Sequence, residues 1–124
     1  YTPYQPEAAQ GTLQIAFEFQ SLVCQLTGLD VANAGMYDGP TAFSEAALMA
    51  CRLTHRSIVA VLNTVDHRAV EVLKSYTRHQ GIRIDVIEPT ASVLPEDTAC
   101  LMIQSPNFLG SIEDVESYAE IAHR

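Results

Sequence analysis

The chain has 124 residues, with seven basic residues against fifteen acidic ones and a formal net charge of −8. This length suits one small domain, and 48% hydrophobic against 18% charged residues excludes a disordered chain. The acidic balance excludes a nucleic-acid partner, which needs clustered lysine and arginine, and no stretch is apolar enough to predict a membrane span or a secretory signal peptide.

The beginning of the chain predicts an arm, a helix and a connector. Residues 1–10 carry two prolines three positions apart, which favours an extended, proline-rich arm. Apolar residues at helical spacing then predict a helix over residues 11–27 that ends at Gly28. The short, apolar residues 31–37 predict an edge strand or an extended connector.

The rest of the chain alternates helices with apolar strands. A helix capped by Asp38 is predicted to run to Arg52. Two later helices are predicted, one over residues 66–80 and one that begins near residue 112. The predicted strands cover residues 57–62, 82–87 and 99–103. This alternation predicts an α/β fold with a mostly parallel sheet and helices on both faces.

His67 is a candidate site residue because it follows the strand over residues 57–62. Ligand sites of α/β sheets gather beyond the carboxyl ends of the strands. An imidazole at this place could stack on a cofactor ring or move a proton. The alternative is a solvated residue in the first turn of a helix that Thr64 or Asp66 caps.

Lys74 is the only lysine of the chain. Its predicted place is the solvent side of a helix, whereas a lysine that binds a carbonyl compound covalently needs a desolvated pocket. The helix after Asp38 is a poor phosphate site, because Asp38 adds negative charge and Pro40 supplies no N–H. We therefore predict neither a catalytic residue nor a cofactor-binding residue in this chain.

The three cysteines predict neither a metal site nor a disulfide framework. Cys24, Cys51 and Cys100 are far apart and lie among apolar residues. That pattern is typical of small buried side chains in a reducing cytosol. No motif for a nucleotide, a metal or a serine nucleophile occurs elsewhere.

Three stretches of the sequence together resemble one family. They are YTPYQPE with Gln10-Gly11 and the helix that follows, LTGLDVANAGMYDGPTAFSEAALMA (residues 26–50), and QSPNFLGSIED (residues 104–114). In this order they resemble the glycine decarboxylase P-protein of the glycine cleavage system. The resemblance is strongest to subunit 1 of the two-subunit bacterial form and covers nearly the whole chain.

The resemblance implies that residues 1–124 are a single partial domain. This would be an internal fragment of the large domain of a fold-type-I, pyridoxal-phosphate-dependent transferase. The three predicted strands would be the second, third and fourth strands of the family's sheet, and they would lie side by side in the order third, second, fourth. The family enzyme, an aminomethyl-transferring glycine dehydrogenase, decarboxylates glycine and passes the aminomethyl group to the lipoyl arm of the H-protein. Subunit 2 carries the pyridoxal phosphate and its aldimine lysine, so we expect no cofactor in this chain and no activity of the fragment alone.

The family placement also suggests border residues and partners. Tyr1, Tyr4 and Gln5 would border the active site or a subunit interface, with His67 as a further candidate, and the alternative is ordinary packing of the arm on the first helix. The expected partners are subunit 2 and the H-protein, in the bacterial cytoplasm. Because the strand over residues 99–103 would lack its next neighbour, we expect the chain to associate with itself through that edge.

Two other hypotheses remain open from the sequence. A small α/β regulatory or protein-binding module of the receiver type would need an acid cluster at the strand ends and a downstream lysine, and neither arrangement occurs here. A pyridoxal-phosphate-dependent aminotransferase relative would need a cofactor-pairing aspartate and a lysine beyond Arg124.

Overall fold

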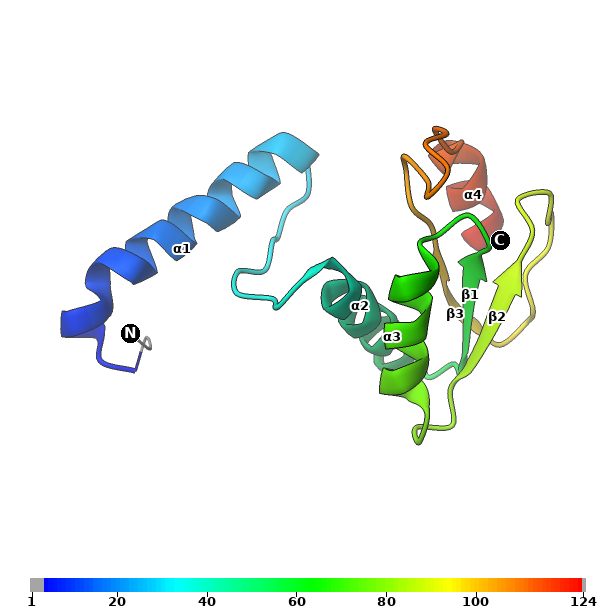
Figure 1. The fold of residues 1–124 in the computed structure, drawn as a ribbon, viewed down its shortest axis with the longest axis horizontal. Coiled ribbons are helices and arrows are strands. Elements are labelled where there is room, and N and C mark those ends of the chain that lie inside the picture. Colours follow the sequence, from blue (N-terminus) through cyan, green and yellow to red (C-terminus); the bar gives the residue numbers. More distant parts are fainter. Residues whose placement is uncertain (1–3, 124) are drawn as a thin grey trace. The chain divides into compact units, whose positions relative to one another are not determined.

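The structure is a computed structural model that describes residues 4–123. Its elements are α1 (Pro6–Thr27), α2 (Gly39–Thr54), β1 (Ile58–Leu62), α3 (His67–Thr77), β2 (Arg83–Ile87), β3 (Thr98–Met102) and α4 (Val115–Ala122) (Figure 1). The chain divides into two compact units, one up to Tyr37 and one from Asp38 onward. That both belong to one partial domain stays a prediction.

The first unit consists of α1 and the connector after it. The extended arm predicted over residues 1–10 is wrong for Pro6–Gln10, which form the first turns of α1. Proline fits there because its missing N–H would have no acceptor within the helix. Gly28 ends the helix with a φ of 72°, which a residue without Cβ adopts without strain.

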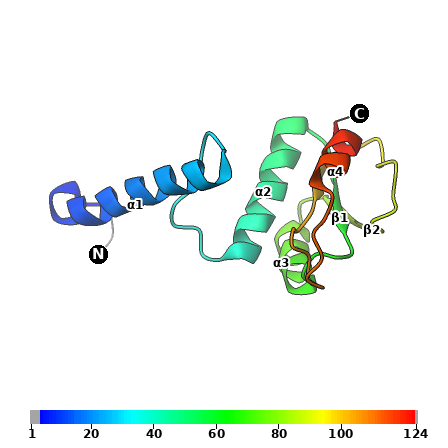
Figure 2. The same ribbon diagram turned by 90° about the horizontal axis from the view of Figure 1, so that it is seen from above.

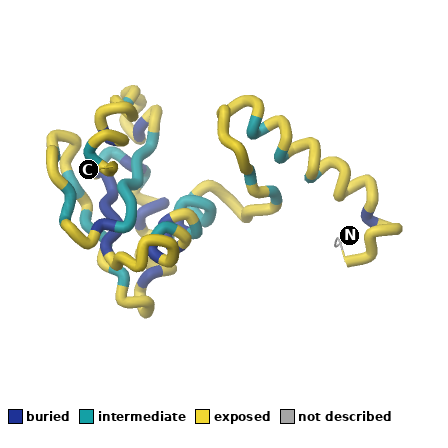
Figure 3. The backbone as a smooth tube through the Cα atoms, turned by 180° about the vertical axis from the view of Figure 1, so that it is seen from behind, coloured by how far each residue is buried: buried dark blue, intermediate teal, exposed yellow. Residues whose placement is uncertain are grey.

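The connector over residues 31–37 contains no strand, so the extended-connector alternative holds. Gln20 Nε2 of α1 donates a 2.7 Å hydrogen bond to the carbonyl oxygen of Ala32 and fixes the connector to the helix. Within this unit most apolar side chains of α1 are exposed (Figure 3). The large ones are Leu13, Ile15, Phe17, Phe19, Leu22 and Leu26.

The second unit is built on a three-stranded parallel sheet with the order β2-β1-β3. The predicted α/β fold is confirmed, and so is the strand order that the resemblance implied. Figures 1 and 2 show α2 and α3 on the same side of the sheet. The right-handed crossover rule places the return from β2 to β3 on the other face. There Tyr118 of α4 donates a hydrogen bond to the carbonyl oxygen of Pro89.

The core of this unit surrounds β1, whose five residues are all buried. A strand is buried throughout only when both faces of its sheet are covered. Leu62 and Leu73 are the largest side chains that are fully buried, and Tyr118 of α4 completes the cluster. This core fixes the positions of the three strand ends. Among residues 4–123, no helix is long and apolar enough to cross a membrane.

Aspartates cap three helices of the second unit. Asp38 accepts a 2.8 Å hydrogen bond from Thr41 N at the start of α2, as predicted. Asp66, rather than Thr64, caps α3. Asp114 caps α4, which therefore begins at Val115 and not near residue 112. Each carboxylate satisfies helical N–H groups that lack an acceptor within the first turn.

Candidate functional site

The loops after β1, β2 and β3 meet at the carboxyl edge of the sheet, where α/β folds place their ligands. Polar side chains from these loops form three separate hydrogen-bonded sets, which together we name the carboxyl-edge cluster: Asn63 with Glu88, Thr64 and Asn107 with Glu113, and Gln104 with the Asp66 N–H. Its members are Asn63, Thr64, Glu88, Gln104, Asn107 and Glu113. Gln104, Asn107 and Glu113 belong to the third stretch that resembles the family. The sequence alone could not show that their side chains lie at this edge.

Glu113 is the acceptor that Thr64 and Asn107 share. Its Oε1 accepts hydrogen bonds from Asn107 Nδ2 and from Thr64 Oγ1, each 2.7 Å long. The Tyr118 hydroxyl lies 3.5 Å from the other carboxylate oxygen. The bonds from Asn107 and Thr64 lower the pKa of Glu113, because they stabilise the charged form. The cluster therefore holds an ionised carboxylate at neutral pH.

Asn107 shapes the turn between β3 and α4. It is buried, and its Oδ1 accepts hydrogen bonds from the backbone N–H groups of Leu109 and Ser111, each 3.0 Å long. The N–H of Phe108 donates to the carbonyl oxygen of Thr64 at 2.9 Å. The turn is thus tied both to itself and to the loop after β1, and it leaves the Phe108 ring half exposed.

His67 lies at the carboxyl edge but outside the cluster. Its side chain is 74% exposed at the first residue of α3. Its ring meets the Phe108 ring edge to face, with 5.4 Å between the centroids. Its Nδ1 is 3.8 Å from Asp66 Oδ1. The solvated first-turn alternative thus describes its surroundings, and a role at an active-site border stays a prediction.

Asp66 connects the start of α3 to the loop after β3. Its N–H donates to Gln104 Oε1 at 2.9 Å. Its carboxylate accepts from the guanidinium and the N–H of Arg68, which lowers its pKa to about 2. The sequence left Thr64 and Asp66 open as the cap of α3 and did not predict this ion pair.

The candidates near the beginning of the chain belong to the first unit. Tyr1 lies outside the described residues. Tyr4 is 87% exposed, so ordinary packing of its ring on α1 is excluded. Gln5 precedes α1 and accepts the N–H groups of Ala8 and Ala9 through its carbonyl oxygen. Whether these residues border an active site stays a prediction.

Lys74 pairs with a carboxylate of its own helix, α3. Its Nζ is 2.7 Å from Glu71 Oε1, and more than half of each side chain is exposed. Within the described range no three side chains that commonly bind metals come together. Lys74 is therefore a solvated surface residue, as predicted.

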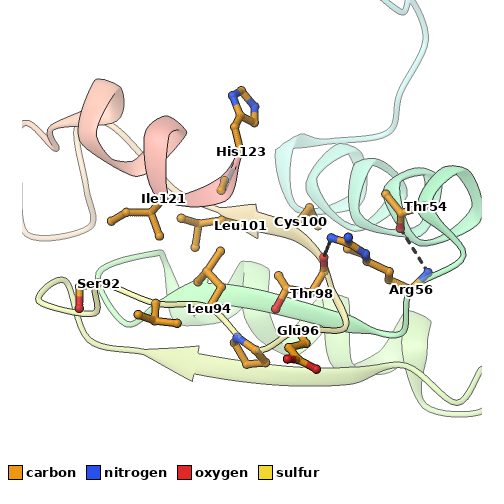
Figure 4. Close-up of a pocket in the computed structure, with 14 residues that line it drawn as sticks. Thr54, Arg56, Ser92, Leu94, Glu96, Thr98, Cys100, Leu101, Ile121 and His123 are labelled. Carbon is orange, nitrogen blue, oxygen red and sulfur yellow. Dashed lines mark hydrogen bonds between the residues drawn. The ribbon is translucent and has the colours of Figure 1, made fainter.

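A hollow of about 600 Å³ lies elsewhere in the second unit, lined by the loop over residues 92–96, β3 and the end of α4. Leu94, Leu101 and Ile121 point toward one another across it (Figure 4). At one end Arg56 Nη1 donates a 2.9 Å hydrogen bond to the carbonyl oxygen of Thr98. No member of the carboxyl-edge cluster lines this hollow. Its mainly apolar lining is more typical of a packing surface than of a catalytic site.

The chain is similar to known proteins along its whole length. Residues 1–124 match the family model described as "Glycine cleavage system P-protein". The probable glycine dehydrogenase (decarboxylating) subunit 1 of Koribacter versatilis is 48% identical over 136 residues, which cover 100% of this chain and 30% of that protein. The protein of the same name from Moorella thermoacetica is 44% identical over 133 residues, with the same coverage.

The fold of the chain is also similar to that of a solved P-protein structure. A crystal structure of glycine decarboxylase (P-protein) of the glycine cleavage system, in inhibitor-bound form, superposes with a TM-score of 0.89 at 41% sequence identity. The superposition covers 99% of this chain and 29% of that one. The chain thus spans about 30% of the length of the curated relatives it matches.

Proposed function

The chain belongs to the glycine cleavage system P-protein family, and from that membership we propose that it is part of subunit 1 of a glycine decarboxylase. The proposed activity of the whole enzyme is decarboxylation of glycine, with transfer of the aminomethyl group to the lipoyl arm of the H-protein. The match over all 124 residues carries this proposal. The chain alone is proposed to be inactive.

Pyridoxal phosphate is the cofactor that the family resemblance implies, and the residues of this chain do not fit it. Lys74 is solvated and paired with Glu71, whereas a lysine that binds this cofactor needs a desolvated pocket. At the start of α2 the carboxylate of Asp38 already accepts the N–H of Thr41 and would repel a phosphate. We propose, as the family resemblance implies, that subunit 2 carries the cofactor.

The contribution proposed for this chain is a rigid border at the carboxyl edge of its sheet. Glu113 and Asn107 hold the loops after β1 and β3 together, so the exposed rings of His67 and Phe108 keep a fixed place. Fixed side chains at such an edge can orient a neighbouring subunit or exclude water from its site. Separately, and from the family resemblance alone, Tyr1, Tyr4 and Gln5 are proposed to border the active site or a subunit interface.

The proposed partners are subunit 2 and the H-protein, and the proposed location is the bacterial cytoplasm. These follow from the family resemblance alone. Association of this chain with a second copy of itself is proposed as well, on the strength of the uncharged edge strand β3. The hypothesis of a small regulatory module is less favoured, because a family match over the full chain accounts for the whole sequence.

A chimeric enzyme tests the proposed function. Residues 1–124 would replace the matching region of the Moorella thermoacetica subunit 1, which is 44% identical. We expect the chimera, assembled with its subunit 2 and lipoylated H-protein, to release carbon dioxide from carboxyl-labelled glycine. A chimera that folds and assembles but releases none would contradict the proposal.

A substitution in the same chimera tests the cofactor assignment. Lys74→Ala is expected to leave both the activity and the cofactor absorbance of the assembled enzyme unchanged, since Lys74 is a surface residue. The matched control is Lys74→Arg, which keeps the ion pair with Glu71. Loss of the cofactor absorbance in both variants would show that Lys74 holds the cofactor and would overturn the assignment to subunit 2.

A further inference from the structure

We draw no further inference here: the strongest candidate, the exposed apolar stripe along one face of α1 formed by Ile15, Phe19, Leu22 and Leu26, carries no proposal because nothing among residues 4–123 shows what covers it.

Discussion

The Thr64 hydroxyl donates a 2.7 Å hydrogen bond to Oε1 of Glu113, a residue 49 positions later in the chain. The Asn107 amide donates to the same oxygen at 2.7 Å, so one carboxylate joins the loop after β1 to the turn after β3. An ionised carboxylate can only accept hydrogen bonds, and this one accepts from the side chains of Thr64 and Asn107. We therefore expect the order of the turn after β3 to depend on the charge of Glu113.

Glu113→Gln should loosen the turn after β3. The carbonyl oxygen of glutamine can still accept from Thr64 and Asn107. It carries no charge, however, so both hydrogen bonds should become weaker than those to the carboxylate. We expect faster hydrogen exchange at the N–H groups of Leu109 and Ser111, which Asn107 holds. Glu116→Gln, on the exposed surface of α4, is the matched control. Unchanged exchange in Glu113→Gln would show that the turn does not need the carboxylate.

The sequence predicted the second unit well because its signals are local. Continuous apolar runs predicted β1 and β3, Asp38 was predicted as a helix cap, and Asp66 was one of two predicted caps for α3, with Thr64. The predicted start of α1 was wrong because prolines favour both an extended arm and the first turn of a helix. Pro6 lies in the first turn of α1.

The carboxyl-edge cluster could not be predicted in the same way. Thr64 and Glu113 come from distant loops, and only the parallel order of β1 and β3 brings them together. Nothing in the spacing of these residues indicates a shared hydrogen bond. The sequence therefore predicted the edge as a place, through His67, but not the residues that organise it.

Leu73→Ala should destabilise the second unit strongly. Leu73 of α3 is fully buried against β1, and truncation of such a side chain leaves a cavity. We expect the free energy of unfolding to fall by about 2–5 kcal/mol, measured by urea denaturation. Leu53→Ala on α2 removes the same atoms from an exposed position and should change it by about 0.5 kcal/mol or less. Equal losses in both variants would contradict the proposed core.

Two glycines of the first unit should respond to alanine with opposite signs. Gly28 has a φ of 72° at the end of α1, so alanine there should destabilise the helix end by roughly 1 kcal/mol. Gly11 lies within α1 with open space around it, so alanine there should stabilise the helix by roughly 0.5–1 kcal/mol. Thermal unfolding followed by circular dichroism measures both effects. A shift of the same sign in both variants would contradict the assigned end of α1.

Asp66 should contribute to loss of stability in acid. The hydrogen bonds from Arg68 lower its pKa from 3.8 to about 2 in the folded protein. Because the folded pKa lies below the unfolded one, this contribution is present above 3.8 and is lost as the pH falls through about 2. Asp66→Asn should therefore flatten the acid limb of a plot of urea midpoint against pH. Glu120→Gln, a neutralisation on the surface of α4, serves as the control, and an equal flattening there would assign the effect to net charge.

Cys100 should react slowly with alkylating reagents in the folded chain. Burial raises its pKa from 9.0 to about 11, and the neighbouring Cys51 thiol adds to that rise. Only the thiolate is a nucleophile, so a rise of this size should slow alkylation roughly 100-fold relative to the urea-unfolded chain. Mass spectrometry after timed iodoacetamide labelling at low protein concentration measures the rate at each cysteine. Cys24, on the partly exposed α1, is the internal reference. The raised pKa also means that this thiol stabilises the fold below pH 9.0 and loses that effect as the pH rises through about 11. Labelling of Cys100 at the same rate in the folded and unfolded chains would show that this thiol is not buried in the fold.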